Sequence, residues 1–128
     1  MDMGQIRDIM EKNIITIEKD QTMLQAAQLM KKNDISFIVI VENGNPIGVL
    51  SERDFVQKFC VDNKKPDEMK ITEIMSYKFR WVEPSTDIED AVQKMLNNNI
   101  RRLLVLDNKK LVGVITQTDL ASYLRDKL

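Results

Sequence analysis

Histidine is absent from this 128-residue chain, and cysteine occurs once. Without an imidazole, the sequence excludes Ser-His-Asp and Cys-His catalytic arrangements, histidine metal ligands and a histidine pH switch. The single cysteine, Cys60, excludes an internal disulfide and a cysteine-based zinc site. We therefore expect no metal site and no enzymatic activity, in a reducing, cytoplasmic setting.

An excess of charge of one sign is also missing. Lys and Arg number 19 and Asp and Glu number 20, so the formal net charge is −1. A chain that neutralises nucleic-acid phosphates needs a clear positive excess, so the balance speaks against a nucleic-acid partner. No apolar run approaches the roughly 18 residues of a membrane span, and the N-terminus has no apolar signal region, so we expect no membrane partner.

What the sequence does contain is a repeat at an offset of 65 residues. Residues 6–10 (IRDIM) resemble residues 71–75 (ITEIM), and the same register continues without a gap. Identical pairs in this register include Ala26 and Ala91, Met30 and Met95, Ile35 and Ile100, Gly48 and Gly113, and Asp54 and Asp119. Each copy is too short to bury a good core alone, so we expect the two to pack about a pseudo-two-fold axis. The predicted domains are residues 1–63 and 64–128, with a polar linker at about 62–70.

Both copies predict the same order of elements. Apolar residues at i, i+3, i+4 and i+7 predict a helix in each copy, capped by Thr22 with Gln25 and by Asp87 with Asp90. Apolar runs and the Asn43-Gly44 hairpin signal predict three strands in each copy. The predicted strands are residues 14–17, 37–41 and 47–50, and residues 79–82, 103–106 and 111–115. The fold class is therefore α/β (α+β), with two βαββα units.

A closing helix ends each predicted unit. Phe55 with Phe59, and Leu120 with Leu124, stand at i, i+4 spacing. The apolar faces of these helices favour a homodimer. Cys60 lies late in the first closing helix, where we expect a buried small hydrophobe rather than a nucleophile, because no base is available to activate it.

One polar motif occurs in both copies, where the last strand meets the closing helix. It reads Gly48-Val-Leu-Ser51-Glu-Arg-Asp54 in the first copy and Gly113-Val-Ile-Thr116-Gln-Thr-Asp119 in the second. A hydroxyl followed three residues later by an acid is an ordinary helix-capping arrangement. The same constellation also suits a nucleoside phosphate, because a helix N-terminus attracts anions and a carboxylate accepts two hydrogen bonds from a ribose cis-diol. The glycines let backbone or ligand approach closely.

These motifs resemble a tandem pair of cystathionine β-synthase (CBS) domains, often called a Bateman module. The resemblance rests on both Ile-Met turns, both apolar strand runs and both Gly-x-x-Ser/Thr-x-x-Asp motifs, and it covers essentially the whole chain. It implies two βαββα repeats that form two clefts between them. It also implies that the chain binds adenosine-type ligands such as AMP, ADP or ATP, sometimes S-adenosylmethionine or a dinucleotide.

The resemblance also implies which residues contact the ligand. Asp54 and Asp119 would hold ribose, and Ser51 and Thr116 would lie near ribose or phosphate. The residues that would frame the adenine are Thr16, Ile35 and Ser36 in the first copy, and Ile100 and Arg101 in the second. Trp81 replaces the threonine in the second copy, where its indole either stacks on a base or fills the pocket. We favour a filled pocket, so the two sites need not have equal affinity.

Phosphate recognition also needs cations. The candidates are Arg53, Arg101 and Arg102, and Thr118 takes the place of Arg53 in the second copy. Neighbours on a strand point to opposite faces, so we expect one of the two adjacent arginines to face solvent. The sequence agrees equally well with an Arg53 that points outward as a surface charge.

We therefore expect a stand-alone regulatory module that binds an adenosine nucleotide, requires no cofactor and acts through an unknown effector protein. The alternatives are a ligand-free interaction or scaffold protein, an S-adenosylmethionine-binding protein and a nucleic-acid-binding protein. The choice of adenosine ligand, the number of occupied clefts and the orientation of the dimer stay open.

Overall fold

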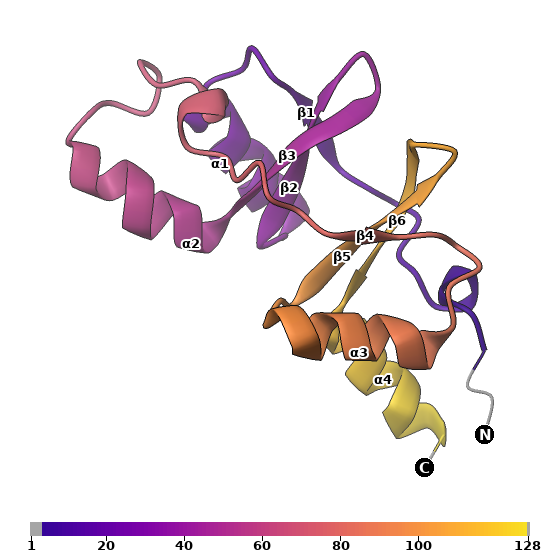
Figure 1. The fold of residues 1–128 in the computed structure, drawn as a ribbon. Helices are drawn as coiled ribbons and strands as arrows, with labels where there is room; N and C mark the ends of the chain where they lie inside the picture. Colours follow the sequence, from indigo (N-terminus) through magenta and orange to yellow (C-terminus); the bar gives the residue numbers. More distant parts are fainter. Residues whose placement is uncertain (1–3, 128) are drawn as a thin grey trace. The chain divides into compact units, whose positions relative to one another are not determined.

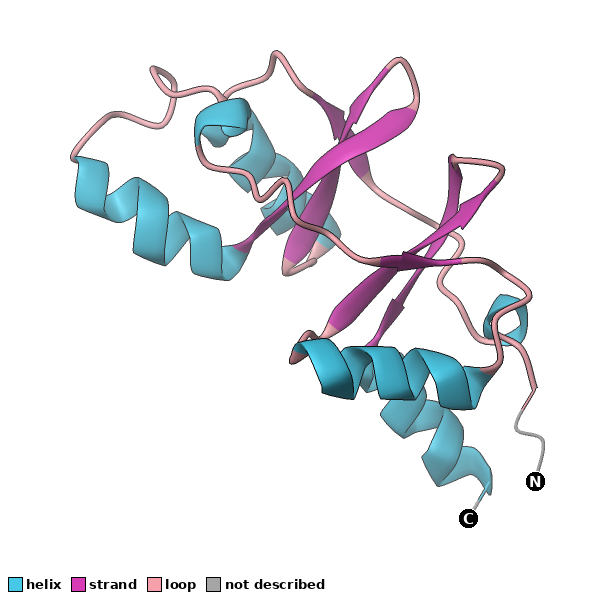
Figure 2. Cartoon of the chain, viewed as in Figure 1, coloured by secondary structure: helices cyan, strands magenta, loops and turns pink. Residues whose placement is uncertain are grey.

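The computed structural model describes residues 4–127 and divides them into two compact units. The first unit is formed by residues 15–78, and the second unit by residues 4–14 together with residues 79–127. Each unit contains one three-stranded sheet and the helices attached to it (Figures 1 and 2). The predicted mixed α+β architecture is confirmed for each unit.

The sheet of the first unit has the order β1-β2-β3. Strand β1 (Thr16–Glu18) pairs in parallel with β2 (Phe37–Glu42), and helix α1 (Met23–Asn33) connects them. Strand β3 (Asn45–Ser51) returns antiparallel to β2 and leads into α2 (Glu52–Asp54). The strands β2 and β3 are longer than the apolar runs indicate, because their polar ends continue the ladder beyond the buried residues.

The second unit repeats this topology with β4-β5-β6. Its elements are β4 (Trp81–Val82), α3 (Ile88–Asn98), β5 (Arg102–Asp107), β6 (Lys110–Thr116) and α4 (Gln117–Lys127). Trp81 faces Leu104 across the parallel pair as Thr16 faces Val39 in the first unit, so the strand register follows the 65-residue repeat. A bulge interrupts the antiparallel pair at equivalent places, Ile40/Val41 and Val105/Leu106.

The helix caps of the two units differ. At the start of α1, Thr22 and Gln25 form the expected capping box, in which Thr22 Oγ1 accepts a hydrogen bond from Gln25 N. The predicted cap by Asp87 is wrong, because its side chain makes no capping bond. The backbone of the N-terminal segment takes its place, since Ile88 N donates to the Gly4 carbonyl.

Each unit takes its Ile-Met turn from the other sequence repeat. The turn η1 (Ile6–Asp8) belongs to the second unit, where Glu11 pairs with Val114 of β6. The turn η4 (Ile71–Glu73) belongs to the first unit, where Ser76 pairs with Val49 of β3. The compact units therefore differ in composition from the predicted sequence repeats 1–63 and 64–128.

The predicted linker takes part in the first unit. Met69 is buried, and its carbonyl accepts a hydrogen bond from Met23 N at the start of α1. The Pro66 carbonyl accepts another from Leu24 N. These bonds satisfy two of the free N–H groups of the helix end, so the last residues of the linker act as part of the fold.

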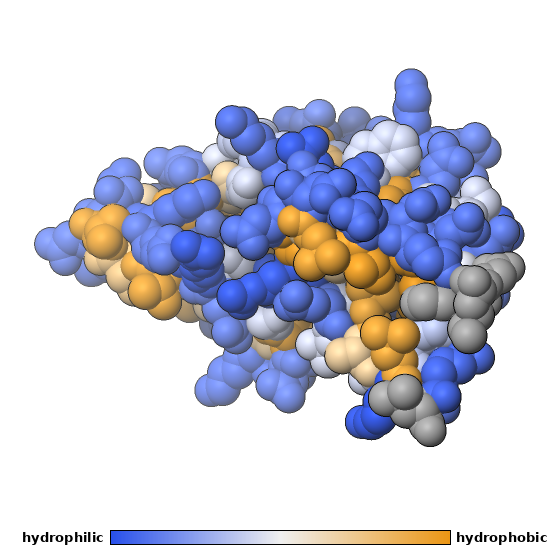
Figure 3. All heavy atoms as spheres, turned by 60° about the horizontal axis from the view of Figure 1, so that its bottom comes forward, coloured by the Kyte–Doolittle hydropathy of each residue, from blue (hydrophilic) through white to orange (hydrophobic). Residues whose placement is uncertain are grey.

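Each unit has its own apolar core. In the first unit, Ile71, Ile74 and Met75 pack with residues of α1 and the sheet. In the second unit, Ile6 packs with the corresponding residues of α3 and its sheet. Apolar side chains also reach the surface in patches among hydrophilic ones (Figure 3), and the large exposed ones are Val56, Val61, Tyr77, Trp81, Leu96 and Leu124. No helix of the described residues combines the length and the apolar character that a membrane span needs.

The first closing helix is irregular. After α2 it continues as a π-helical turn, η2 (Phe55–Phe59), closed by a hydrogen bond from Cys60 N to the Phe55 carbonyl. Phe55 and Phe59 meet edge to face with ring centroids 6.3 Å apart, and both pack against the first core. The expectation of a buried Cys60 is wrong, since this residue is exposed. With Phe59 turned to the core, the next residue lies around the helix from the buried face.

Gly48 and Gly113 accommodate the Ile-Met turns. A Cβ atom added at Gly48 would lie 2.7 Å from Met75 Sδ and 3.0 Å from the Ser76 carbonyl oxygen. At Gly113 it would lie 2.5 Å from Met10 Sδ and 3.3 Å from the Glu11 carbonyl oxygen. These glycines of the repeated motif therefore serve the close approach of chain segments within each unit.

We predict that Gly48→Ala lowers the free energy of unfolding by about 1–3 kcal/mol, because the added methyl overpacks the contact with Met75. Chemical denaturation measures the change. In a Met75→Ala background the same substitution should cost clearly less, since the clashing sulfur is gone. An equal cost in both backgrounds would contradict the role of Met75 and assign the cost to the Ser76 carbonyl. Gln28→Ala on the exposed face of α1 serves as a control, with an expected change within about ±0.5 kcal/mol.

The two hairpin turns give a second prediction. Both have positive φ at their central residues, Asn43 and Gly44 in the first unit and Asn108 and Lys109 in the second. Lysine is strained at φ 69°, where glycine is not. We expect Lys109→Gly to raise the free energy of unfolding by about 0.5–1 kcal/mol, as measured by the same denaturation. A lower stability would show that the turn tolerates lysine without cost.

Candidate functional site

The predicted site residues of each unit gather at one end of its sheet. Because β1 and β2 are parallel and β3 runs back, the starts of β1 and β2 lie beside the end of β3. Phe37 faces Ser51 in this ladder, and Thr16 faces Val39 two residues further along. The same pairing places Trp81, the start of β5 and Thr116 at one end of the second sheet.

A backbone hydrogen bond closes this end in both units. Glu52 N donates to the Ser36 carbonyl at 2.9 Å, and Gln117 N donates to the Arg101 carbonyl at 2.9 Å. Each bond ties the residue before the central strand to the first residue of the closing helix. The predicted adenine-framing residues Ile35–Ser36 and Ile100–Arg101 are thereby held next to the polar motif of their own unit.

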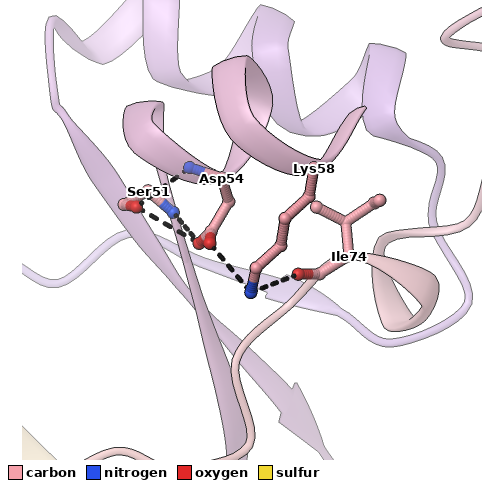
Figure 4. A network of polar contacts seen from close by, with 4 residues as sticks. All are labelled: Ser51, Asp54, Lys58 and Ile74. Atoms are coloured by element: carbon pink, nitrogen blue, oxygen red, sulfur yellow. Dashed lines mark hydrogen bonds and ion pairs between the residues drawn. The ribbon is translucent and has the colours of Figure 1, made fainter. Parts of the chain in front are cut away.

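In the first unit, Ser51 and Asp54 hold each other in a capping box (Figure 4). Asp54 Oδ2 accepts hydrogen bonds from Ser51 N at 2.9 Å and from Ser51 Oγ at 3.2 Å. Asp54 N lies 3.4 Å from Ser51 Oγ, to which it donates. These bonds fix the carboxylate at the start of the closing helix through one of its two oxygens. The Asp54 side chain is 13% exposed.

The second unit repeats this arrangement, and two of its three bonds are shorter. Asp119 Oδ2 accepts hydrogen bonds from Thr116 N and from Thr116 Oγ1, both at 2.9 Å. Asp119 N donates to Thr116 Oγ1 at 3.1 Å. The capping reading of the motif is therefore correct for both copies. It does not exclude ligand binding, because the capping bonds use only one carboxylate oxygen in each unit.

The remaining oxygen distinguishes the two units. Asp54 Oδ1 forms an ion pair with Lys58 Nζ at 3.1 Å, and the same ammonium donates to the Ile74 carbonyl at 3.4 Å (Figure 4). Within the part of the chain that the structure describes, Asp119 Oδ1 has no such partner. Sequence reasoning did not single out Lys58, although its i, i+4 spacing from Asp54 on a helix is a usable signal.

The other predicted residues of the first unit differ in burial. Thr16 and Ser36 are exposed, as a ligand contact requires. Arg53 is exposed as well, which agrees equally with a phosphate contact and with a solvated surface charge. Ile35 is half-buried and packs against the core of its unit, so only part of its side chain faces outward.

In the second unit, Trp81 is 44% exposed, and its carbonyl accepts a hydrogen bond from Lys94 Nζ at 2.8 Å. Ile100 packs against the core of this unit, as Ile35 does in the other. Arg101 and Thr118 are exposed, whereas Arg102 is half-buried at the start of β5. The expectation that one of the two adjacent arginines faces solvent is confirmed, and Arg101 is that residue.

No group of three or more His, Cys, Asp or Glu side chains among residues 4–127 is arranged to hold a metal ion. Away from the site, a hydrogen bond to Glu42 raises the pKa of Lys19. The site residues offer hydroxyls, carboxylates and exposed cations for hydrogen bonding.

Comparison with solved structures finds the same fold. The chain superimposes on a conserved CBS domain protein of unknown function from Thermoplasma acidophilum with a TM-score of 0.84 and 33% identity, over 93% of this chain and 68% of that one. It superimposes on the CBS domain pair of protein MJ0100, solved in complex with 5′-methylthioadenosine and S-adenosyl-L-methionine, with a TM-score of 0.86 and 23% identity. That match covers 97% of this chain and 98% of the other.

Sequence comparison agrees with the structural one. An uncharacterized protein of Methanopyrus kandleri is 36% identical over 117 residues, which are 90% of this chain and 60% of the relative. The chain thus spans less than two thirds of that relative's length. The family model described as CBS domain matches twice, at residues 6–60 and 71–126. These two matches include both copies of the polar motif, and the chain therefore belongs to the CBS domain family.

Proposed function

We propose that this CBS domain pair is a regulatory module that binds an adenosine nucleotide of the AMP, ADP or ATP type at its sheet-end sites. The observation that carries the proposal is the arrangement of Asp54 and Asp119. In each unit the capping bonds hold a half-buried carboxylate by one of its oxygens, and the residues before the central strand border it. This geometry suits recognition of a ribose.

A ribose cis-diol offers two adjacent hydroxyl donors, and a carboxylate can accept both. Asp54 and Asp119 are already oriented by backbone N–H groups, so little side-chain freedom would be lost when a ligand binds. The hydroxyls of Ser51 and Thr116 can turn from the carboxylate toward a ligand oxygen. The second site keeps its free oxygen beside an exposed indole at Trp81, which is large enough to stack on a base or to fill the pocket.

Two further observations support the class of ligand. Protein MJ0100 has the same fold and was solved with two ligands that share an adenosine moiety. Exposed arginines stand near the motif in both units of this chain, Arg53 next to Asp54 and Arg101 at the bond to Gln117. Guanidinium groups bind phosphate well, which favours a phosphorylated adenosine over a neutral one.

We also propose that the chain forms a homodimer and acts on an effector protein. The exposed apolar side chains Val56 and Val61 on the first closing helix favour an interaction surface there. The same observation supports the alternative of a ligand-free interaction protein.

Calorimetry with AMP, ATP and S-adenosylmethionine separates these functions. A regulatory nucleotide-binding module should give heat and a rise in the melting temperature with AMP or ATP. Binding of S-adenosylmethionine alone would show that the ligand is a sulfonium nucleoside instead of a nucleotide. No heat and no thermal shift with any of the three would reject the proposal in favour of the interaction protein.

We predict that Asp54→Asn and Asp119→Asn each weaken AMP binding at their own unit by about 10- to 100-fold, because a charged acceptor of two hydrogen bonds is lost. Asparagine keeps an oxygen that can accept from the Ser51 or Thr116 backbone, so the helix start should stay folded. Titration calorimetry gives the affinities and circular dichroism checks the fold. Wild-type affinity in both variants would exclude these carboxylates from the site.

A further inference from the structure

The residue one helical turn after the aspartate differs between the two copies of the motif. Lys58 follows Asp54 by four residues, and Tyr123 follows Asp119 by four. The Lys58 ammonium lies 3.1 Å from Asp54 Oδ1, the oxygen that the capping box leaves unused. Figure 4 shows the lysine side chain running from the π-helical turn toward both this oxygen and the Ile74 carbonyl.

We propose that Lys58 determines the ligand specificity of the first unit by occupying Asp54 Oδ1 in competition with the ligand's hydroxyl groups. This inference rests on the proposed function, because it assumes that Asp54 receives the ribose. A ligand must displace or share the ammonium before both carboxylate oxygens can accept its diol. In the second unit tyrosine at the corresponding position brings no such cation, so Asp119 discriminates less.

The charge of the displaced group sets the selectivity. Asp54 is 13% exposed and Lys58 47% exposed, so the lysine can swing out while the aspartate stays. A phosphorylated adenosine offers the released ammonium a new anionic partner. Neutral adenosine offers none, and the cationic sulfonium of S-adenosylmethionine adds repulsion. The first unit should therefore prefer anionic nucleotides.

The central test compares adenosine and AMP in an Asp119→Asn background, which leaves the first unit to dominate the titration. Lys58→Met removes the ammonium and keeps the length of the side chain. We expect adenosine to bind about two- to fivefold more tightly, because the competing ion pair is gone. We expect the preference for AMP over adenosine to fall at least about fivefold, because the phosphate loses its charged partner.

Two matched variants make the result specific. Lys58→Arg keeps a cation within reach of Asp54 and should retain most of the AMP preference. Lys32→Met removes an exposed lysine of α1 and should leave both affinities unchanged. A loss of net charge alone would lower AMP binding in either Met variant, but it would not tighten adenosine binding. Unchanged or weaker adenosine binding by Lys58→Met would overturn the proposal.

A measurement without ligand tests the Lys58–Asp54 interaction separately from the proposed nucleotide binding. In a double-mutant cycle of Asp54→Asn and Lys58→Met, the effects on the unfolding equilibrium should be coupled by about two- to fivefold. Absence of coupling would overturn the role of Lys58 even if AMP binds. Coupling without any AMP binding to the unmodified protein would instead reject the proposed nucleotide site, and the specificity role with it.

Discussion

The structure depends on the close approach of an Ile-Met turn to the last strand of each sheet. Backbone pairing joins Ser76 to Val49 in the first unit and Glu11 to Val114 in the second. Gly48 and Gly113 leave room for the methionine side chains that arrive with these turns. Each turn also delivers a fully buried isoleucine, Ile71 or Ile6, to the core. A repeat of this size has too little apolar surface to close its core alone, and the turn supplied by the other repeat completes it.

The capping box then links folding to recognition. The hydroxyl and the carboxylate of each motif begin the closing helix by satisfying each other's backbone N–H groups. The same bonds set the direction of the carboxylate and leave one of its oxygens for another partner. Capping and ribose binding are therefore compatible uses of a single aspartate, since the first uses Oδ2 and the second would begin at Oδ1. A motif of this kind keeps its site rigid without any residues devoted to that purpose alone.

The sequence predicted the elements of both units because burial imposes a period on local residues. The apolar spacing of α1 and α3, the strand runs and the hairpin at Asn43 all reflect contacts with near neighbours in the chain. The missing cap at Asp87 was not predictable in this way. The hydrogen bond that replaces it runs from Ile88 N to the carbonyl of Gly4, which is far away in sequence. The exchange of the Ile-Met turns between the two sequence repeats was not predicted for the same reason. Cys60 was misplaced because it follows Phe59, which packs against the core, and therefore lies around the helix from the buried face.

The site shows the same division between local and distant information. The Ser51–Asp54 and Thr116–Asp119 pairs were readable as short motifs, and their hydrogen bonds have the predicted pattern. The bonds from Glu52 to Ser36 and from Gln117 to Arg101 join segments that no local pattern connects. One asymmetry between the units lies outside the repeated motif, at the position four residues after each aspartate. Two copies that share the hydroxyl and the aspartate of a binding motif can therefore still differ in what they bind, because the residue one helical turn later decides whether a cation faces the carboxylate.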